Sequence, residues 1–579
     1  MRLPRPATAL IVVIAALAVL LTFVDQYQPL SDADFFWHLK SGEWIWQHRA
    51  LPSADPFAYT TPRNLNVMQR FTLTSYWLSQ TAFYLLYLAG GFPAIVFFKF
   101  ALVALLVLAL LPRNRGDGLL FTGVLALGLV ALGMYPLERP QALSFVLYGA
   151  LLSLLASFRA PAAEGWRRFI AVAGVPALML LWANVHGAYL LGQATILLVV
   201  ALEGVKFLRP GLDPLPAASY RRLLTAGLLG LAFSLVNPNT YHALAYLAPS
   251  APGSPLVNIE YQSTLYIFTR LNLYRVAVFW LLLALTLLGV AARWRKPDIT
   301  TIALLAGLGG VSFFRSRYVP FFIVAAVPVA ACYLSGERVR RWSRPAVAGL
   351  ALLALLYFGW TDRSALIAPG SGEWIDRNFP EKEADFILRQ DLQGNLYNNP
   401  NWGGYLIWRL APARKVFSDG RSLDVPSYLS TVTIDNARAQ PGSGVPAWKS
   451  LLDANDIQYV LTPLFSRGVI YPLVGALLND RDWGLVFTGY NSLIFVRMGP
   501  RNSRVLFSSG LSKERFLDDA IGWYSRQSAR EPGNMFLHLT RAELLLSRKR
   551  FAEARAAYQR VLELAPFNLV ARERLKAIP

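Results

Sequence analysis

Apolar runs with almost no charged residues recur along this chain of 579 residues. Ala7–Val24, Phe92–Leu111, Gly118–Met134 and Ala346–Phe358 are examples, and a membrane-spanning helix needs about 20 such residues. Only 16% of the residues are charged, against about 25% in soluble domains, so too little polar chain remains to enclose these runs. The sequence therefore predicts a polytopic membrane protein and excludes an ordinary soluble one.

The apolar runs predict eleven spans, at residues 7–24, 92–111, 118–135, 141–158, 169–184, 187–204, 222–237, 275–292, 299–314, 317–334 and 345–360. The first is expected to be a retained anchor, because no small-residue cleavage site follows it. With the N-terminus inside, every inside loop carries Arg or Lys, from Arg113 in the first to Arg344 in the last. This bias is the positive-inside rule, and it places the chain after about Phe358 outside.

The same orientation gathers the other polar residues on the non-cytoplasmic face. The outside segments hold Asp32, Asp34, His38, Glu138, Arg139, Asn184, His186, Asn237, His242, Glu260, Arg315 and Arg317. Ionisable groups at a membrane boundary cost free energy unless they are solvated or paired, so this face is the predicted functional site. Ordinary loop polarity is the alternative.

The formal net charge of +21 does not predict nucleic-acid binding, because basic cytoplasmic loops and a basic tail account for it. A single cysteine, Cys332, lies within an apolar run and excludes a disulfide framework or a thiolate metal site.

The first outside segment, residues 25–91, is too long to be a simple connection. Aromatic residues at helical spacing after Ser31, with Trp37, Trp44 and Ile45 on one side, predict a helix lying in the membrane interface. A second interfacial helix is expected over Trp77–Leu88.

Two carboxylates lie at the start of the first of these helices. Asp32 is expected to cap it and Asp34 to lie in its first turn. Asp34 could deprotonate an acceptor hydroxyl, or with Asp32 hold a divalent cation beside a phosphate. The alternative is a capping pair that the helix dipole favours.

Beyond the spans the composition becomes that of a soluble chain. Strand-like runs at residues 394–398, 415–418, 457–462, 484–488 and 492–497 alternate with helical stretches, which predicts a small outside α/β domain over residues 363–500. Asp419 and Arg421 are expected to pair in a turn beside Gly420, with sugar or acceptor binding as the alternative.

The tail, residues 510–579, carries an internal repeat. Ala520 and Ala554, like Tyr524 and Tyr558, are 34 residues apart, which is the tetratricopeptide (TPR) period. About one and a half repeats are present, fewer than the three or so of an independent solenoid, so a short TPR-like helical tail with a possible protein partner is expected.

This arrangement resembles the GT-C superfamily of membrane glycosyltransferases, and within it a bacterial branch with an outside α/β domain. The resemblance covers roughly residues 7–500. The matching motifs are Asp32-x-Asp34-x-x-Trp37-His38-Leu39, Gly42-Glu43-Trp44-Ile45, Asp55-Pro56-Phe57-x-Tyr59-Thr60, Glu138-Arg139-Pro140-Gln141, Trp182-Ala-Asn184-x-His186-Gly187, Asn237-Pro238, Arg315–Arg317, Asn401–Tyr405 and Val416–Arg421.

The resemblance implies a GT-C-like membrane domain over residues 1–362 and a bacterial plasma-membrane location. Asp34 would be the catalytic acidic residue, assisted by Asp32. The lipid phosphate would be held by Arg139, His186, Arg315 and Arg317. The remaining candidates for substrate binding are His38, Glu138, Asn184 and Glu260.

Unlike better-known branches, the sequence has no second acidic pair in a later loop, since Glu138 and Glu260 are isolated. A divalent metal ion is therefore left open, with Asp32 and Asp34 as its ligands if one is used.

The expected activity is transfer of a sugar from a polyprenyl-phosphate-linked donor to an acceptor at the outer face. The alternatives are a non-catalytic, membrane-anchored TPR assembly factor for an envelope complex and, third, a lipid or solute transporter. Few charges lie mid-span and no duplication of the spans is evident, which disfavours the transporter. The sugar and the acceptor are not indicated by the sequence.

Overall fold

The structure, a computed structural model, describes residues 5–159, 166–209, 211–247, 259–271, 274–293, 298–362, 374–438, 445–466, 468–489 and 491–578. The chain forms two compact units. The first comprises Met1–Asp32, His38–Ser53 and Leu65–Asp376, and the second comprises Ala33–Trp37, Ala54–Asn64 and Arg377–Pro579. The long segment 25–91 thus contributes to both units. The predicted domain boundary at residues 362–363 is at the edge of the described chain, and the basic residues predicted at 295 and 296 lie outside it.

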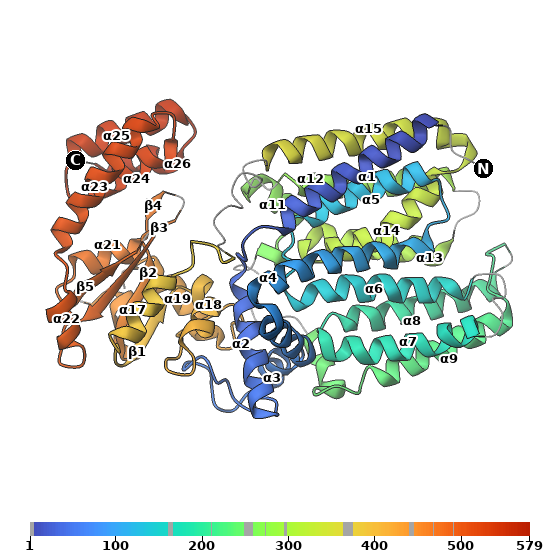
Figure 1. Cartoon of the computed structure of the whole chain (residues 1–579), viewed down its shortest axis with the longest axis horizontal. Helices are drawn as coiled ribbons and strands as arrows, with labels where there is room; N and C mark the ends of the chain where they lie inside the picture. The colour runs from blue at the N-terminus through green and yellow to red at the C-terminus, as the bar shows by residue number, and fades with distance from the viewer. Residues whose placement is uncertain are drawn as a thin grey trace. The chain divides into compact units, whose positions relative to one another are not determined.

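The first unit consists of helices (Figure 1), and a helix lies at each of the predicted spans. These helices are α1 (Arg5–Gln26), α4 (Trp77–Leu110), α5 (Gly118–Leu132), α6 (Pro140–Ser157), α7 (Trp166–Val185), α8 (Tyr189–Val205), α9 (Ala217–Phe233), α12 (Val276–Ala292), α13 (Ile299–Phe314), α14 (Val319–Leu334) and α15 (Glu337–Thr361).

In the described chain, six segments are long and apolar enough to cross a membrane. They are Ala7–Gln26, Val67–Arg113, Pro140–Ser157, Tyr189–Leu208, Ser316–Leu334 and Glu337–Thr361. The apolar helices Gly118–Leu132, Phe169–Val185, Val276–Ala292 and Ile299–Phe314 are shorter. The chain is a multi-pass membrane protein, while the number of eleven crossings stays a prediction.

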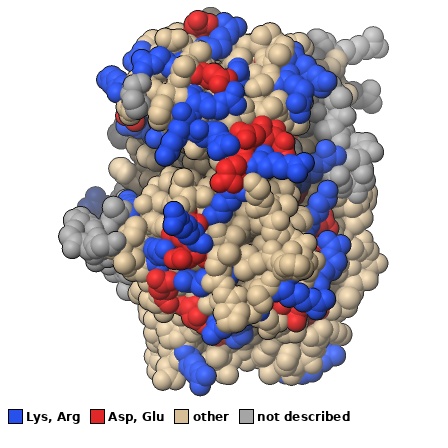
Figure 2. Space-filling view, turned by 90° about the vertical axis from the view of Figure 1, so that its left-hand side faces the viewer, with Lys and Arg blue, Asp and Glu red and all other residues tan. Residues whose placement is uncertain are grey.

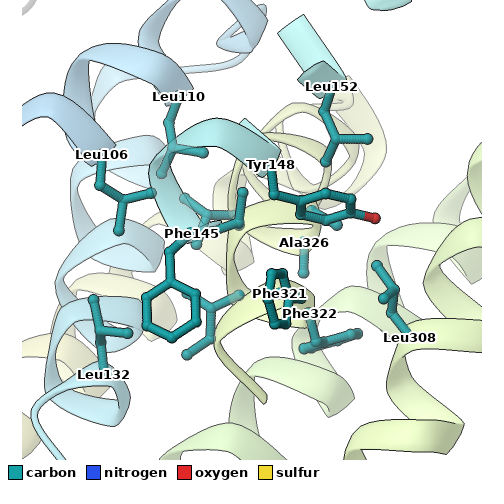
Figure 3. Packing of buried hydrophobic residues seen from close by; sticks show 14 of the residues in the cluster. Leu106, Leu110, Leu132, Phe145, Tyr148, Leu152, Leu308, Phe321, Phe322 and Ala326 are labelled. Carbon is teal, nitrogen blue, oxygen red and sulfur yellow. The ribbon is translucent and has the colours of Figure 1, made fainter. Parts of the chain in front are cut away.

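Buried residues of α4, α5, α6, α13 and α14 pack together in the core of this unit (Figure 3). Phe145 and Phe321 meet edge to face, with their ring centroids 5.3 Å apart, and Tyr148 packs on Phe321 at 5.5 Å. Helix α14 is buried along almost its whole length. The apolar residues of α14 therefore pack against protein rather than lipid.

Helix α4 contains a sharp bend. Gly90 and Gly91 depart from helical geometry, with φ at +64° for Gly91, and Pro93 follows. Left-handed backbone is accessible to glycine at little cost, and proline can begin the next helical turn. The bend separates the predicted interfacial helix 77–88 from the predicted span 92–111.

Arg113, in the first of the predicted inside loops, bonds the backbone of α14. Its guanidinium donates to the backbone oxygens of Val324 at 2.9 Å and Ala325 at 3.1 Å. Pro328 in α14 has no N–H, so the oxygen of Val324, four residues earlier, lacks its usual helical partner. Arg113 supplies that hydrogen bond.

Short helices connect the spans on the side of the candidate residues. They are α2 (Ala33–His48), α3 (Val67–Thr74), η3 (Thr240–Leu247), η4 (Ile259–Tyr261), α11 (Thr264–Leu271) and η5 (Ser316–Tyr318). The residues of α2 belong to both units. Of the three residues predicted on the lipid-headgroup side of α2, Trp37 and Ile45 are buried in protein, at 5% and 8% exposure, and Trp44 is partly exposed.

The second unit is built on a four-stranded sheet with the order β1-β2-β6-β5. The strands are β1 (Asn395–Asn398), β2 (Ile457–Pro463), β5 (Trp483–Thr488) and β6 (Ser492–Arg497). β1 and β2 are parallel and the other pairs antiparallel. Helices α17 (Glu381–Arg389), α18 (Pro400–Leu410), α19 (Val425–Asp435), α20 (Ala447–Ala454) and α21 (Pro472–Asn479) and the hairpin β3 (Phe465–Ser466)–β4 (Val469–Ile470) complete it.

One predicted strand, at residues 415–418, is absent from the sheet. Val416 instead makes an isolated bridge with Ala58, and the Tyr59 hydroxyl donates to the oxygen of Leu396 at 2.8 Å. The local sequence could not predict this, because its partner, the segment Ala54–Asn64, is more than 300 residues away.

The tail consists of α22 (Ser503–Ser509), α23 (Lys513–Arg530), α24 (Met535–Ser547), α25 (Phe551–Leu564) and α26 (Leu569–Ala577). α23 and α25 end 34 residues apart, at Arg530 and Leu564. The Tyr558 hydroxyl of α25 donates to Glu543 of α24 at 2.5 Å. Figure 2 shows many Lys and Arg side chains on the part of the surface that these helices form.

Candidate functional site

Arg139 holds two carboxylates from distant parts of the first unit. It precedes Pro140, the first residue of α6. Its guanidinium forms a two-pronged ion pair with Asp32, with Nη2 2.8 Å from Oδ1 and Nε bonded to Oδ2. Nη1 donates to Oε1 of Glu260 at 2.9 Å. Glu260, isolated in the sequence, therefore shares this guanidinium with Asp32, and the side chains of Arg139 and Glu260 remain partly exposed.

The turn before α14 is packed against the segment that carries Glu260. Ser316 donates its backbone N–H to the oxygen of Gln262 at 3.0 Å. Arg315 donates to the oxygen of Tyr261 at 2.6 Å, and the Arg317 guanidinium lies 4.7 Å from the Tyr261 ring centroid. The predicted residues Arg315 and Arg317 thus lie beside Glu260, with Arg315 bonded to backbone rather than to a carboxylate.

Glu138 lies behind this cluster. Its carboxylate is 3.8 Å from the ammonium of Lys99 on α4, and both side chains are buried. Burial raises the pKa of Glu138, although Lys99 opposes the shift. Glu138 is thus buried beside Lys99 and adjacent in sequence to Arg139.

His186 lies in the turn between α7 and α8, and only 7% of it is exposed. Its Nδ1 is 2.9 Å from the hydroxyl of Ser144 on α6 and accepts the backbone N–H of Ala188 at 3.1 Å. Burial, together with the nearby positive charge of Arg317, lowers the pKa of His186 to about 3. His186 is therefore neutral at physiological pH and lies near Arg317.

His38 joins the same group of aromatic side chains. Its ring is 5.1 Å from that of Tyr76, centroid to centroid, and Tyr76 is 5.3 Å from His186. Nδ1 of His38 is 3.1 Å from the side-chain amide of Gln80 on α4. His38 and His186 therefore lie on either side of Tyr76.

Asn184 ties helices together. It accepts the indole N–H of Trp77 at 2.9 Å and donates to the backbone oxygens of Leu180 and Val236 at 2.9 and 2.8 Å. Both N–H groups of its amide are thus used within the protein, and Asn184 holds the ends of α4, α7 and α9 together.

Asp34 belongs to the second unit. It lies in the first turn of α2, as expected, and its Oδ1 accepts the indole N–H of Trp37 at 3.1 Å. A Cβ at Gly420 would collide with its carboxylate, so only glycine allows this approach.

The chain on either side of Gly420 is held by a buried ion cluster. Arg421 bonds Asp419 at 2.7 and 2.8 Å and Asp55 at 2.9 and 3.0 Å. None of the Arg421 side chain is exposed. The expected pairing of Asp419 with Arg421 is confirmed, and Asp55 completes the cluster.

The comparisons with solved structures bear on the fold. The archaeal oligosaccharyltransferase AglB from Archaeoglobus fulgidus, in complex with an inhibitory peptide and a dolichol-phosphate, aligns with a TM-score of 0.51 at 12% identity, over 97% of this chain and 86% of that chain. The arabinofuranosyltransferase AftD from Mycobacteria aligns with a TM-score of 0.50 at 16% identity, over 87% of this chain and 42% of that chain. This chain has the GT-C fold. ArnT from Cupriavidus metallidurans in the apo state aligns with a TM-score of 0.48 at 15% identity, over 86% of this chain and all of that one. No protein-family model and no curated protein matches the sequence.

The described part of this GT-C chain contains no group of three or more His, Cys, Asp or Glu residues arranged to hold a metal ion. Both oxygens of Asp32 bond the guanidinium of Arg139, so Asp32 as placed does not offer a free carboxylate to a cation. The residues of the site, as placed, therefore do not fit a metal ion.

Three residues around the candidate site were not predicted from the sequence. Lys99 is the one charged residue of an apolar span, Ser144 is one of several small polar residues in another, and Tyr261 is an aromatic residue in a loop. A charged residue inside a span indicates a functional role or an ion pair, so the sequence contains a signal that points to Lys99. Ser144 gave no such signal, because serine is tolerated in membrane helices.

Proposed function

We propose that this protein is a membrane glycosyltransferase that moves a sugar from a polyprenyl-phosphate carrier to an acceptor at the non-cytoplasmic face. The observation that carries the proposal is the convergence of Arg139, Arg315, Arg317 and a neutral His186 around Glu260 and Asp32, within a GT-C fold. Guanidinium groups bind phosphate oxygens in two-pronged geometry, and neutralise charge that grows on a leaving phosphate.

The reaction needs a base for the acceptor and a cation for the leaving group. The acceptor oxygen attacks the anomeric carbon of the sugar while its proton passes to the carboxylate of Asp34. The bond between that carbon and the phosphate oxygen breaks, and its electron pair leaves with the polyprenyl phosphate. Arg139 and Arg317 stabilise the added negative charge.

Asp34 is assigned as the base because it lies in the first turn of α2 and a hydrogen bond orients its carboxylate. The indole N–H of Trp37 donates to one oxygen, and the backbone of Gly420 packs closely against the carboxylate. Asp32 assists by holding Arg139, and His38 packs against Tyr76.

The finer topology is part of this proposal. Eleven crossings with the N-terminus in the cytoplasm put the candidate residues, the α/β sheet and the tail outside, in a bacterial plasma membrane. The positive-inside distribution of Arg and Lys supports this orientation. The 34-residue spacing of the tail helices supports a TPR-like repeat that binds a protein partner.

The direct test is sugar transfer by the purified protein in lipid, supplied with polyprenyl-phosphate-linked sugars and candidate acceptors. Asp34→Asn is expected to remain folded and to lose transfer by at least about a thousand-fold, within the range over which loss of a base and of its orientation acts. Asp519→Asn, at a well-exposed tail position, is the matched control and is expected to be as active as wild type. Full activity of Asp34→Asn would remove the base assignment.

A second candidate function is a non-catalytic assembly factor anchored by the spans. The tail favours it, because Phe567 and Leu569 at the start of α26 are 85% and 70% exposed. Full-length Asp34→Asn distinguishes the two functions in a strain that lacks the protein. Restoration of the phenotype by this variant would favour the assembly factor, and failure to restore it would favour the transferase.

A further inference from the structure

Hydrogen bonds connect three buried side chains in series and end at His186. The indole N–H of Trp182 on α7 donates to the hydroxyl oxygen of Ser144 on α6 at 2.8 Å. That hydroxyl is in turn 2.9 Å from Nδ1 of His186. Trp182 and Ser144 are completely buried, so water does not compete for these hydrogen bonds.

The donor of each bond in this series follows from chemistry. A backbone N–H can only donate, so Nδ1 of His186 accepts from Ala188 at 3.1 Å and carries no proton. Ser144 therefore donates its single hydroxyl hydrogen to Nδ1, while its oxygen accepts from the indole of Trp182. In a neutral imidazole the proton must then be on Nε2.

The imidazole stays neutral over the physiological range. Burial and the charge of Arg317 lower the pKa of His186 to about 3. Nε2 has no hydrogen-bond partner in the part of the protein that the structure describes, and Tyr76 packs 5.3 Å from the ring, centroid to centroid. The group presents one N–H donor next to a guanidinium.

We propose that Ser144 and Trp182 are positioning residues that hold His186 in the Nε2–H tautomer, so that it donates a hydrogen bond to an anionic oxygen of the bound phosphate beside Arg317. This inference rests on the proposed function for the identity of the ligand. A neutral donor stabilises the anion without adding a mobile proton, so the phosphate is not protonated by His186 as it leaves.

The tautomer can be tested without ligand or activity. The chain has five histidines, so selective ¹⁵N-histidine labelling and solid-state NMR in lipid bilayers resolve few signals, and loss of one set in His186→Gln assigns them. The wild type is expected to show an unprotonated Nδ1 and a protonated Nε2, unchanged between about pH 5 and pH 8, where an ordinary histidine titrates. An Nδ1–H tautomer, or a protonated ring near pH 6, would overturn the proposal.

Substitutions of Ser144 and Trp182 test whether these residues position His186. Ser144→Ala and Trp182→Phe are expected to give a mixture of tautomers. Ser153→Ala is the matched control, because Ser153 is on the same helix and its hydroxyl bonds only the backbone oxygen of Ala109, at 2.7 Å. The proposal is overturned if the spectra of Ser144→Ala and Ser153→Ala are both like wild type.

Binding of undecaprenyl phosphate, with inorganic phosphate as a second probe for the headgroup alone, links the tautomer to the ligand. His186→Ala is expected to weaken binding by about ten- to a hundred-fold, which is the effect of losing one hydrogen bond to a charged group. Ser144→Ala is expected to weaken binding by about ten-fold, and Ser153→Ala is expected to leave it unchanged. Failure of the wild type to bind either probe would contradict the proposed function. Equal binding by wild type, His186→Ala and Ser144→Ala would overturn this inference alone.

Discussion

Arg139 is held between two carboxylates that come from segments more than 100 residues away on either side, and this makes it the most constrained charge of the site. Asp32 is 9% exposed, and both of its oxygens bond the guanidinium. Removing the guanidinium would take away the two-pronged ion pair of a largely buried carboxylate, which costs far more than losing an exposed pair.

Arg139→Ala is therefore expected to lower the free energy of unfolding by about 2–3 kcal/mol and to abolish binding of polyprenyl phosphate. Arg560→Ala is the control, because the Arg560–Glu563 pair is well exposed, and its effect should stay below about 1 kcal/mol. Thermal unfolding in detergent checks both variants, and equal stability of the two would contradict the assigned role of Arg139.

The environment of Asp435 predicts that the stability of the protein depends on pH. Burial raises the pKa of this carboxyl from 3.8 to about 6, although hydrogen bonds from Tyr397 at 2.7 Å and Asn399 at 3.2 Å favour the ionised form. A raised pKa means that the folded state binds the proton more tightly than the unfolded state. The contribution of Asp435 to the free energy of unfolding is therefore fully present below about pH 4. It is lost as the pH rises to about 6 and beyond, and the loss amounts to up to about 3 kcal/mol.

Hydrogen exchange in α19 measures this effect. Protection of α19 is expected to fall between pH 4 and pH 7 in the wild type after correction for intrinsic exchange, and to change little in Asp435→Asn. Protection that rises with pH in the wild type would show that the pKa of Asp435 is lowered rather than raised.

At the scale of elements, the bend in α4 depends on one backbone conformation. Gly91 has φ +64° and ψ −156°, a region that residues with a Cβ occupy only with strain of about 1–3 kcal/mol. Gly91→Ala is expected to destabilise the protein by this amount. Gly307→Ala is the control, because Gly307 lies within α13 and a Cβ there meets nothing within 4 Å, so the change should be neutral or stabilising by up to about 1 kcal/mol. Thermal unfolding that ranks the two variants in the opposite order would show that Gly91 is not required by the bend.

The contact between Arg113 and α14 predicts coupling between two elements. Arg113→Leu leaves the oxygen of Val324 without a donor and is expected to cost about 1–3 kcal/mol. Pro328→Ala restores a backbone N–H that can bond the same oxygen, so the loss in the double variant should be smaller than the sum of the single losses by about 1 kcal/mol. Strict additivity in a thermal unfolding cycle would mean that Arg113 does not compensate for Pro328.

At the scale of the whole molecule, sequence patterns predicted what depends on local composition. A helix occurs at every long apolar run because a chain in lipid must satisfy its backbone groups internally. The alternating runs after residue 394 gave four of the five expected strands. The polar residues of the site could be listed because they interrupt the apolar pattern.

What depends on contacts distant in sequence could not be predicted. Trp37 looked like a headgroup residue but bonds Asp34. Asn184 bonds Trp77 and the backbone of Val236, which are far from it in the sequence. The segment Ala54–Asn64 belongs to the second unit through bonds such as Thr60 to the oxygen of Phe417, at 2.7 Å. In each case a residue type that suits two environments was placed by a partner that local sequence does not reveal.

The most direct test of the proposed transferase is mass spectrometry of the lipids that co-purify in mild detergent with the wild type and with Asp34→Asn. A polyprenyl phosphate in the wild type, with the sugar-loaded form enriched in Asp34→Asn, is the expected result, because the variant binds the donor but does not complete transfer. This result would also identify the sugar. Bulk phospholipid alone in both samples would contradict the proposed donor and favour the anchored assembly factor.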